Sequence, residues 1–313
     1  MAIHLVTGGA GFIGSSIAER LLQSGETVRV IDDFSTGRAQ NLASMRGRIE
    51  VVTGSICDAA VVAEAMGGVE IVFHQAAIPS VARSVKNPAP SMMANVQGTT
   101  VVLEEARHAG VRRLIFASSS SAYGDTPTLP KVETMPAHPL SPYAVSKLTG
   151  ELLLRVSAEL HGLETLSLRY FNVFGPRQDP KSQYAAVIPA FVAAALAGRR
   201  PFVFGDGEQT RDFCYVDNVV DANMLAAAAP KRLTGEVLNV ACAERTSLND
   251  LLRMIEDETG TRLTPEHGSP RAGDVRDSLA DIGAARSLLG YEPKVRIREG
   301  LRRTIDALRS TFG

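Results

Sequence analysis

The sequence predicts an α/β fold in which a doubly wound parallel sheet is joined to a smaller, interleaved α/β domain. Three observations lead to this prediction. Short apolar runs alternate with longer mixed stretches through the first half of the chain, a pattern typical of a parallel sheet with helices on both faces. A glycine-rich turn from Gly8 to Gly14 follows the first apolar run. The alternation loosens after Phe171, which indicates that a second, smaller unit begins there.

The apolar runs and the stretches between them predict the individual elements. Buried strands are expected at 3–6, 27–31, 49–53, 71–74, 113–117 and 164–170. Helices are expected between them at 11–24, 59–66, 95–109 and 143–161. In the looser half, the pattern predicts helices at 185–197, 248–259 and 282–289, strands at 202–204 and 237–240, and a polar loop at 176–184.

The change of pattern divides the chain into two units of unequal size. Residues 1–170 are expected to form the larger domain, and residues 212–242 to return to it. Residues 171–211 and 243–313 then make up the smaller domain. A chain of 313 residues is long enough for one large domain with a smaller one appended.

The composition argues against several classes of function. With a net charge of −1, the chain gives no electrostatic reason to expect nucleic acid or a membrane as a partner. It has no apolar stretch long enough to span a bilayer and no signal-peptide pattern, so we expect a cytoplasmic protein. The three cysteines, Cys57, Cys214 and Cys242, form no C-x-x-C pair, so neither a disulfide framework nor a metal site is expected.

The turn after the first strand has the pattern G-x-x-G-x-x-G, with Gly8, Gly11 and Gly14 at the start of a helix. Glycines there let the backbone approach a pyrophosphate, which then lies at the helix N-terminus. The second strand ends in Asp32-Asp33, and an acidic side chain at this position can bind ribose hydroxyls and disfavour NADP. These features predict a Rossmann-type domain that binds NAD, with Asp32 the better candidate for the ribose contact.

A second group of polar residues follows the strand at 113–117. Four serines, 118–121, come directly after it, and Tyr143 and Lys147 open the helix that follows. A spacing of four residues puts both side chains on one helix face. A tyrosine, whose unperturbed pKa is about 10, needs help to act as a base at neutral pH. We expect the Lys147 ammonium to lower the pKa of Tyr143, and a serine to bind the substrate oxygen.

With these motifs in place, the chain resembles the extended short-chain dehydrogenase/reductase superfamily over essentially its full length, and within it the nucleotide-sugar 4-epimerases. The motifs that carry the resemblance are Thr7–Gly14, 32–37, 74–77, 118–124, 143–147, 168–173 and 210–213. The resemblance implies a catalytic set of Ser119, Tyr143 and Lys147, with Ser120 as a neighbour.

The resemblance also implies a set of residues that bind NAD. They are Gly8, Gly11, Phe12, Ile13, Gly14, Asp32, Asp33, Ser35, Thr36, Gly37, Ile56, Gln75, Ala76, Ala77, Asn95, Tyr143, Lys147 and Tyr170. One departure is visible after the third strand, where the family often has an acidic residue near the adenine. Here the pair is Ser55-Ile56, so a contact from position 55 is in doubt and Asp58 is a possible substitute.

For the nucleotide sugar, the resemblance implies that Arg211 and Arg271 hold the diphosphate, Asp274 a ribose and Asn172 the sugar-side phosphate. Guanidinium groups suit the first task because they bind phosphates bidentately. The uracil pocket would be lined by 186–189 and 202–204. The full set of expected substrate residues is Ser80, Ser119, Ser120, Tyr143, Asn172, Ala186, Val187, Phe202, Val203, Phe204, Arg211, Arg271, Asp274 and Ser278.

The serine segment favours one reaction among those of the superfamily. Dehydratases and decarboxylases typically have an acidic residue there, where this chain has Ser120-Ser121-Ala122. We therefore expect reversible 4-epimerisation of a UDP-hexose through a 4-keto sugar. A UDP-glucuronate 4-epimerase or decarboxylase on the same scaffold is the alternative, and a non-catalytic dinucleotide-sensing protein is a second one.

Ser278 bears on the size of the sugar. Some relatives restricted to glucose and galactose have a tyrosine at the matching position, whereas the small Ser278 would leave room for an N-acetyl group. We therefore expect UDP-GlcNAc/UDP-GalNAc as substrates, together with UDP-Glc/UDP-Gal. The resemblance further implies a homodimer built from the helices at 88–109 and 143–161.

Overall fold

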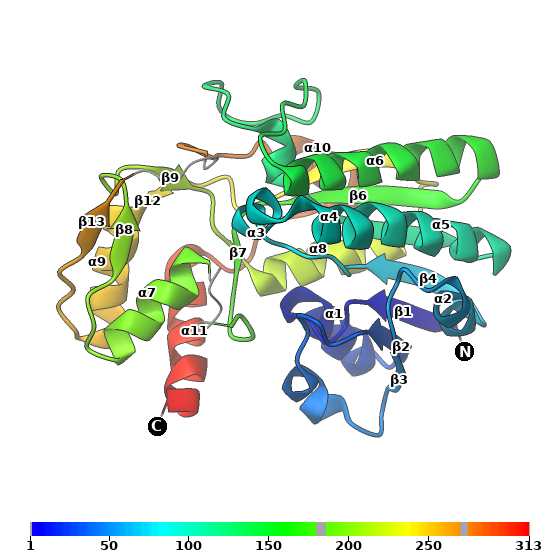
Figure 1. Cartoon of the computed structure of the whole chain (residues 1–313), viewed down its shortest axis with the longest axis horizontal. Coiled ribbons are helices and arrows are strands. Elements are labelled where there is room, and N and C mark those ends of the chain that lie inside the picture. Colours follow the sequence, from blue (N-terminus) through cyan, green and yellow to red (C-terminus); the bar gives the residue numbers. More distant parts are fainter. Residues whose placement is uncertain (1, 180–185, 270–274, 313) are drawn as a thin grey trace.

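The computed structural model describes residues 2–179, 186–269 and 275–312, and within them a seven-stranded parallel sheet dominates the larger domain. Its strand order is β11-β6-β5-β4-β1-β2-β3, and Figure 1 shows the part from β4 through β1 and β2 to β3. The strands are β1 (Ile3–Thr7), β2 (Thr27–Asp32), β3 (Glu50–Thr53), β4 (Val69–His74), β5 (Arg113–Ser119), β6 (Glu164–Tyr170) and β11 (Thr234–Val240). The direction of winding reverses between β1 and β4, which confirms the predicted doubly wound sheet. Ligands of such folds bind at the carboxyl ends of the strands beside this reversal.

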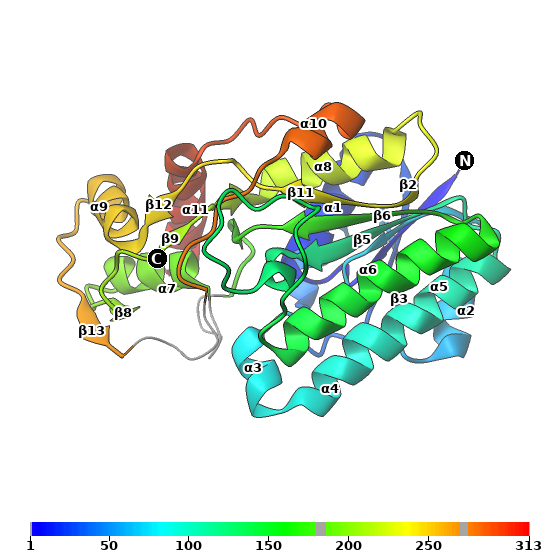
Figure 2. The same cartoon turned by 90° about the horizontal axis from the view of Figure 1, so that it is seen from above.

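Helices cover both faces of the sheet, and Figure 2 shows the two layers from above. One layer holds α2 (Ala59–Met66), α5 (Gly98–His108) and α6 (Pro142–His161), and the other holds α1 (Phe12–Gln23), α8 (Val216–Ala228) and α10 (Gly283–Leu289). Before α5 the chain is already helical in α3 (Val81–Lys86), α4 (Pro88–Met92) and the π-turn η2 (Met93–Gln97). Short 3-10 segments are η1 (Ala39–Met45) and η3 (Ser120–Tyr123).

Strand alternation supplies a separate core for each layer. Successive side chains of a strand point to opposite faces. Leu5 therefore packs with Val62 and Val102 of the α2–α5 layer, whereas Val6 packs with Ile17 of α1. All five of these residues are buried. This two-sided burial explains why the strands of the sequence are runs of apolar residues without polar alternation.

The smaller domain lies at one end of the sheet, on the left of Figure 1. Its helices α7 (Val187–Leu196), α9 (Leu248–Thr259) and α11 (Ile297–Phe312) pack together. Three strand pairs complete it and join it to the sheet domain: β8 (Phe202–Phe204) with β13 (Glu266–Gly268), β9 (Thr210–Arg211) with β12 (Thr246–Ser247), and β7 (Val173–Phe174) with β10 (Cys214–Tyr215). No helix among the described residues is long and apolar enough to cross a membrane.

The chain passes between the two parts more than once. It leaves the sheet after β6, returns with α8 and β11, and leaves again toward α9. β11 pairs with β6 in parallel, from Thr234 beside Thr165 to Val240 beside Tyr170. This return places the loops that follow β6 and β11 next to each other at the carboxyl edge of the sheet.

Candidate active site

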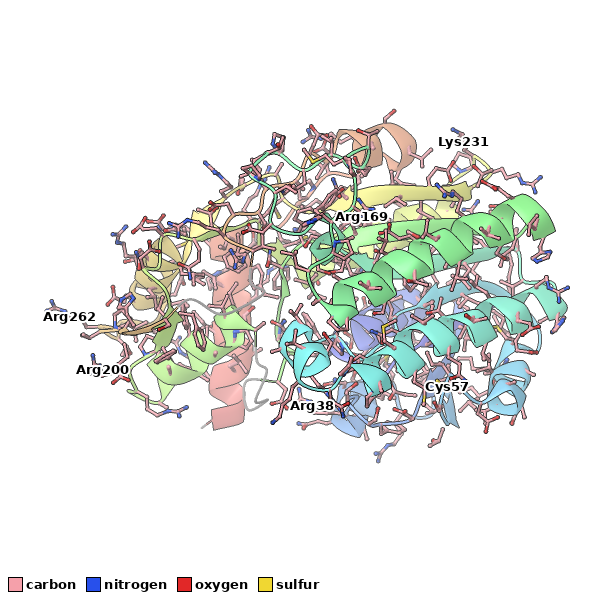
Figure 3. The ribbon with its side chains drawn as sticks, turned by 45° about the horizontal axis from the view of Figure 1, so that its top comes forward. Arg38, Cys57, Arg169, Arg200, Lys231 and Arg262 are labelled. Atoms are coloured by element: carbon pink, nitrogen blue, oxygen red, sulfur yellow. The ribbon has the colours of Figure 1, made fainter. Side chains whose placement is uncertain are left out.

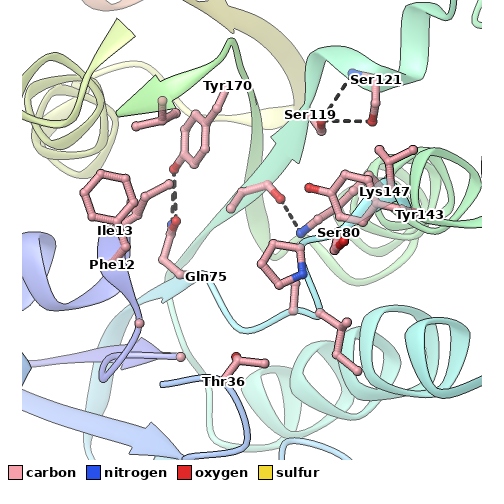
Figure 4. Close-up of a pocket in the computed structure, with 18 of the residues that line it drawn as sticks. Phe12, Ile13, Thr36, Gln75, Ser80, Ser119, Ser121, Tyr143, Lys147 and Tyr170 are labelled. Carbon is pink, nitrogen blue, oxygen red and sulfur yellow. Dashed lines mark hydrogen bonds between the residues drawn. The ribbon is translucent and has the colours of Figure 1, made fainter. Parts of the chain in front are cut away.

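A cavity of about 910 Å³ lies where the winding of the sheet reverses, between the two parts of the chain (Figure 4). It is at the upper end of the volumes usual for small-molecule sites. The predicted site residues that line it are Gly8, Gly11, Phe12, Ile13, Gly14, Asp32, Asp33, Ser35, Thr36, Ile56, Gln75, Ala76, Ala77, Ser80, Ser119, Ser120, Tyr143, Lys147, Tyr170, Asn172, Ala186, Arg211 and Ser278.

The glycine-rich loop has the close packing that its sequence predicts. Gly8 has a φ of +65°, and a Cβ there would lie 2.7 Å from the backbone of Ala76. A Cβ on Gly14 would lie 2.3 Å from the carbonyl oxygen of Gly8. Helix α1 begins after Gly11 without a side-chain cap and has no acidic residue in its first turn. Its first N–H groups therefore point to the cavity without a competing carboxylate, an arrangement that fits a pyrophosphate.

The two acidic residues after β2 shape the next loop. Asp32 accepts hydrogen bonds from the backbone of Ala10 at 2.9 Å and of Phe34 at 2.8 Å, and its burial raises the pKa of its carboxyl group. A Cβ on Gly37 would lie 2.6 Å from the Asp32 carboxylate, so Gly37 packs behind Asp32 and is not among the cavity-lining residues. Asp33 accepts from the Ser35 backbone at 2.9 Å. Each carboxylate retains lone pairs that can accept hydrogen bonds from ribose hydroxyl groups.

Asn95 lies behind the cavity wall. Its side chain is buried and accepts a hydrogen bond from the Ile78 backbone at 2.8 Å, while its amide nitrogen donates to Ser146 at 2.9 Å. It is not among the lining residues, although Ile78 is. Asn95 thus connects the loop after β4 to helix α6. Its geometry is that of a residue that supports the cofactor pocket from behind.

The remaining cofactor positions form the far side of the cavity. Gln75 donates to the Tyr170 hydroxyl at 3.2 Å, and Asn223 donates to the same oxygen at 2.8 Å, so Tyr170 is held rigidly (Figure 4). Ser55 lines the cavity beside Ile56. Asp58, considered as a substitute for the missing acid, accepts from the Ala60 backbone at 3.0 Å and caps α2. Asp58 is not among the cavity-lining residues, so the structure adds no support for it as the substitute.

Helix α6 brings the tyrosine and the lysine to the end of β5. Ser141 caps the helix by accepting from the Ala144 backbone at 3.2 Å, and Pro142 occupies its first turn. Tyr143 and Lys147 both line the cavity, beside each other and below Ser119 in Figure 4. Ser119 accepts from the Ser121 hydroxyl at 2.9 Å. The predicted set of Ser119, Tyr143 and Lys147 therefore comes together in space.

The electrostatics of this set differ from the prediction. Burial raises the pKa of Tyr143 to about 12, and the hydrogen bond with Ser119 only partly offsets this effect. Burial also lowers the pKa of Lys147 to about 7. The expectation that Lys147 lowers the pKa of Tyr143 is therefore wrong for the ligand-free chain. The physical reason is desolvation, which penalises the charged forms of both side chains.

The sugar side of the cavity is formed by residues of several loops. Asn172 donates to the Ser278 hydroxyl at 3.1 Å, and both residues line the cavity. The Arg211 guanidinium donates to the backbone oxygens of Thr210 at 2.9 Å and Arg276 at 2.8 Å. The other predicted phosphate and ribose ligands, Arg271 and Asp274, lie outside the described residues.

The predicted uracil segments are only partly at the cavity. Ala186 and Pro189 line it, whereas Val187 packs against the core. In β8, Val203 is fully buried, and the exposed rings of Phe202 and Phe204 contact each other with centroids 4.8 Å apart. These three residues are not among the cavity-lining set. Strand alternation is the reason, since it turns Val203 into the core and its two neighbours outward.

Arg38 and Arg177 line the cavity and were missed from the sequence. Arg38 donates to the Arg177 backbone oxygen at 2.9 Å and lies 3.7 Å from the Asp179 carboxylate. Figure 3 shows Arg38 on the side of the larger domain that faces the smaller one. Its position directly after the Asp32–Gly37 loop was the available signal. Arg38 connects the cofactor loop to the segment that follows β7.

The sheet is of the Rossmann type, and its glycine-rich loop lies where the direction of winding reverses. Together with the neighbouring Ser/Tyr/Lys set, these features define an NAD-dependent enzyme of the short-chain dehydrogenase/reductase class. Residues 4–241 match the NAD dependent epimerase/dehydratase family. The chain therefore belongs to this family, which confirms the predicted superfamily and the expectation of NAD as the family's cofactor.

Similar proteins and solved structures cover nearly the whole chain. A UDP-glucose 4-epimerase of Mycolicibacterium smegmatis is 42% identical over 98% of both chains. The structure of a Thermotoga maritima UDP-glucose 4-epimerase with UDP-glucose has a TM-score of 0.94 at 40% identity, covering 99% of this chain and 100% of that one. A UDP-N-acetylglucosamine 4-epimerase from Methanobrevibacter ruminantium M1, in complex with UDP-N-acetylmuramic acid, has a TM-score of 0.94 at 36% identity and 99% coverage of both chains.

A third structure differs from these in the sugar that it contains. The UDP-glucuronic acid 4-epimerase of Bacillus cereus, in complex with UDP-glucuronic acid and NAD, has a TM-score of 0.92 at 33% identity and 99% coverage of both chains. Proteins similar to this chain over their full length thus act on neutral, N-acetylated and acidic sugars, so overall similarity does not identify the sugar.

Proposed function

We propose that this protein catalyses the reversible 4-epimerisation of a UDP-sugar with tightly bound NAD. The observation that carries the proposal is the meeting of Ser119, Tyr143 and Lys147 in the cavity that also contains the glycine-rich loop. The names of the similar proteins support the UDP-sugar class. The absence of an acidic residue at 119–121 supports simple oxidation and reduction over loss of water.

In the proposed reaction, Tyr143 removes the proton from the sugar O4 as the C4–H bond breaks, and a 4-keto sugar results. Bound NAD supplies the reversible acceptor for the C4 hydrogen. Ser119 holds the O4 oxygen through a hydrogen bond. Lys147, when protonated, stabilises the Tyr143 phenolate. The keto sugar turns over about its diphosphate, and Tyr143 then returns the proton to O4 after reduction on the other face.

Binding is proposed to be divided between the two parts of the chain. Residues 1–170 with 212–242 form the NAD domain, and residues 171–211 with 243–313 form the nucleotide-sugar domain. The cavity-lining cofactor residues named above bind NAD, with Asn95 and Gly37 as supports. Arg211 and Asn172 bind the nucleotide sugar. The assignment of Arg271, Asp274, Val187 and 202–204 to this ligand rests on the family resemblance alone.

For the sugar, we propose UDP-GlcNAc/UDP-GalNAc together with UDP-Glc/UDP-Gal. The small Ser278 side chain lines the cavity beside Asn172, which leaves space that a tyrosine would fill. UDP-glucuronate remains the second candidate, and the Bacillus cereus enzyme is the specific observation in its favour. A charged sugar would need a cationic partner in the cavity; of the lining lysines, Lys131 already donates to Thr126 at 2.5 Å.

A homodimer is proposed through the outer surface of α4–α6. Apolar side chains lie exposed along one face of α6, namely Val145 at 39%, Leu152 and Val156 at 46% and Leu160 at 71%. Met93 in the neighbouring π-turn is 57% exposed. An apolar stripe of this extent on a helix usually marks a protein interface. A second copy presenting the same helices would cover it with the symmetry of a twofold dimer.

The test is product analysis with five purified substrates: UDP-Glc, UDP-Gal, UDP-GlcNAc, UDP-GalNAc and UDP-GlcA. The proposal expects interconversion within both neutral pairs without added NAD and no net NADH release. Conversion of UDP-GlcA alone would replace the proposed sugar by the acidic one. Failure to convert any of the five, with NAD bound, would overturn the proposed function.

A further inference from the structure

Asp212 is a fully buried carboxylate that accepts hydrogen bonds from separate segments of the backbone. One carboxylate oxygen accepts from the Cys242 N–H at 2.9 Å, and the other accepts from the Ala280 N–H at 3.1 Å. The N–H groups of Ala243 and Glu244 also interact with it. Asp212 thus connects the turn after β11 to the segment at 278–280, which is far from it in the sequence.

The backbone of Asp212 holds the sugar side of the cavity as well. Its N–H donates to the Ser278 hydroxyl at 3.3 Å, and its carbonyl oxygen accepts from the Asn172 amide at 3.2 Å. Arg211, the next residue, lines the cavity together with Asn172 and Ser278. Three cavity-lining residues from three separate segments therefore meet at Asp212.

The backbone around Asp212 is unusual. Among the described non-glycine residues, three have positive φ, and two of these, Asn172 at 31° and Ala243 at 56°, contact Asp212. Non-glycine residues in this region cost energy and persist only where the surroundings enforce them. Bonds to Asp212 are among the contacts that hold both loops in these conformations.

Only the ionised carboxylate accepts at full strength through both of its oxygens. A protonated acid carries hydrogen on one oxygen, which makes that oxygen a weaker acceptor, and an amide replaces one oxygen by an NH2 group that cannot accept. Either the Cys242 or the Ala280 bond is then weakened in the protonated acid and lost in the amide. A change of protonation at this buried group therefore loosens one of the two segments.

We propose that Asp212, in its ionised form, is a positioning residue: its carboxylate fixes the Asp212 backbone between the turn after β11 and the segment at 278–280. That backbone in turn holds Asn172, Arg211 and Ser278 in place for the nucleotide sugar. The carboxylate is not needed for NAD. The inference rests on the proposed function for the identity of the ligand. It deepens that function because it makes the arrangement of the sugar-side residues depend on one carboxylate. That carboxylate does not itself line the cavity.

Burial raises the pKa of Asp212 to about 6, against the lowering effect of the backbone bonds. The charge is therefore lost just below neutral pH. The titratable groups around it come from every neighbouring segment. Cys214 and Tyr291 are affected electrostatically by Asp212, and Cys242 donates its N–H to it. The guanidinium of Arg211 donates to backbone oxygens, Glu244 is paired with Arg296, and Lys131 donates to Thr126. Asp281 accepts from the Gly283 N–H at the start of α10.

The experiment compares the wild-type protein with Asp212→Asn and with Asp281→Asn as the matched control. The Asp281 carboxylate likewise accepts a backbone N–H, at 2.7 Å from Gly283, but this bond lies within one turn of the chain and does not connect two distant segments. KM and kcat are measured between pH 5 and 8 with UDP-Gal and UDP-GlcNAc, whose diphosphates keep their charge over this range. Amide hydrogen exchange of 240–245 and 276–282 and NAD content are measured on the same samples.

For the wild type, KM is expected to rise about tenfold for each pH unit below 6, because the ionised fraction falls by that factor. The Asp212→Asn protein is expected to have a KM at pH 7.5 raised at least about tenfold, since one charge-assisted bond is lost, with no further rise at pH 5. Its NAD content stays normal, and one of the two segments loses amide protection. The Asp281→Asn protein behaves as the wild type in all of these measurements.

The sign of the stability effect separates this role from general acid unfolding. Since the folded-state pKa of Asp212 is raised above 3.8, the group contributes stability that is present below pH 3.8 and is lost as pH rises through about 6. Weak sugar binding at pH 5 is therefore expected without a loss of stability from this group. A KM rise that only follows a fall in Tm would overturn the proposal.

Other outcomes are equally decisive. A wild-type KM that is flat from pH 5 to 7.5 overturns the positioning role, even if Asp212→Asn fails to fold. If no UDP-sugar is converted, the proposed function fails. The amide hydrogen exchange measurement then tests the positioning role of Asp212 independently of any activity. Equal protection of both segments in Asp212→Asn and the wild type would overturn the role, and selective loss would retain it.

Discussion

Lys147 is joined to Ala117 by a hydrogen bond of 2.8 Å from the lysine Nζ to the backbone oxygen of β5. Ala117 precedes Ser119 by two residues, and Lys147 follows Tyr143 by one helical turn. The bond therefore holds the end of β5, which carries Ser119, against the first turns of α6, which carry Tyr143. Lys147 has a structural task here in addition to its electrostatic one.

The next turn of α6 continues this connection. Ser118 donates to the Glu151 carboxylate at 2.5 Å, and Arg169 of β6 binds both oxygens of Glu151 at 2.8 and 2.7 Å. Figure 3 shows Arg169 in the interior beside α6. A buried pair of this kind is sensitive to loss of either partner. The strands β5 and β6 and helix α6 are thus joined by hydrogen bonds at successive positions behind the catalytic residues.

Replacing Tyr143 by Phe is expected to lower kcat by about 10²–10⁴-fold, because the proton acceptor for O4 is lost. NAD content, measured from the absorbance of the released cofactor, should stay at the wild-type level. Tyr215→Phe is the matched control, since Tyr215 is also buried but is not among the cavity-lining residues. A near-normal rate for Tyr143→Phe would contradict the assigned base.

Replacing Lys147 by Met should change the pH dependence of stability in protein stripped of NAD. Burial lowers the folded-state pKa of Lys147 from 10.5 to about 7, so the folded state binds fewer protons than the unfolded state between these values. The cost of the buried charge is full below pH 7 and is relieved as pH rises toward 10.5. The variant should therefore melt above the wild type at pH 7, and the difference should shrink by pH 9.

Differential scanning fluorimetry at several pH values measures this difference. Lys86→Met, on the exposed end of α3, is the control for loss of a lysine charge. A melting difference between Lys147→Met and the wild type that is constant from pH 7 to 9 would show that burial does not shift this lysine. Activity is expected to be lost in Lys147→Met at every pH.

Gly14→Ala is expected to lose NAD. The added Cβ would lie 2.3 Å from the Gly8 oxygen, so the glycine-rich loop has to open. Gly67→Ala is the control, because its Cβ would lie 3.5 Å from the nearest atom, an ordinary contact. The ratio of absorbance at 260 and 280 nm after purification measures retained cofactor. Full retention in Gly14→Ala would mean that the loop does not contact NAD.

Ser278→Tyr should reduce turnover of the N-acetylated pair more than that of UDP-Glc/UDP-Gal, because the ring occupies space next to Asn172. The substitution also removes the hydroxyl that Asn172 and the Asp212 backbone use. Ser278→Ala separates the two effects, since it deletes the hydroxyl without adding bulk. Equal losses on both pairs in the tyrosine variant would argue against Ser278 as the determinant of sugar size.

A Leu152→Glu/Val156→Glu double variant is expected to be monomeric, because two charges would be buried in the proposed interface. Light scattering should give the mass of one chain, 33.4 kDa, against twice that for the wild type. Leu225→Glu on α8 is the control: Leu225 is 36% exposed but lies in the other helical layer. A wild-type mass equal to one chain would refute the dimer directly.

Local pattern was sufficient for much of the fold. The strands at 164–170 and 202–204 and the helices at 59–66 and 248–259 have the predicted bounds, because each is a compact apolar run or an amphipathic stretch with clear ends. Helix α8 was not predicted, since its small apolar residues carry little periodicity. The helix expected from residue 95 starts earlier, as α4 and the π-turn precede α5.

The site residues were predictable at positions where the chemistry requires one particular type of residue. Gly8, Gly14, Tyr143 and Lys147 are such positions. The raised pKa of Tyr143 was not predictable, because it depends on burial by segments that are remote in the sequence. The buried hydrogen bonds of Asp212 to the turn after β11 and to Ala280 escaped for the same reason.

The late position of β11 in the sequence has a consequence for biosynthesis. Strand β6 ends at Tyr170, but β11, the strand that pairs with its outer edge, does not begin until Thr234. A nascent chain therefore carries an open strand edge while the ribosome adds everything between them, and such edges are templates for aggregation. A gene cut after Tyr170 would leave that edge uncovered permanently, so the larger domain is not a unit that can be expressed by truncation alone.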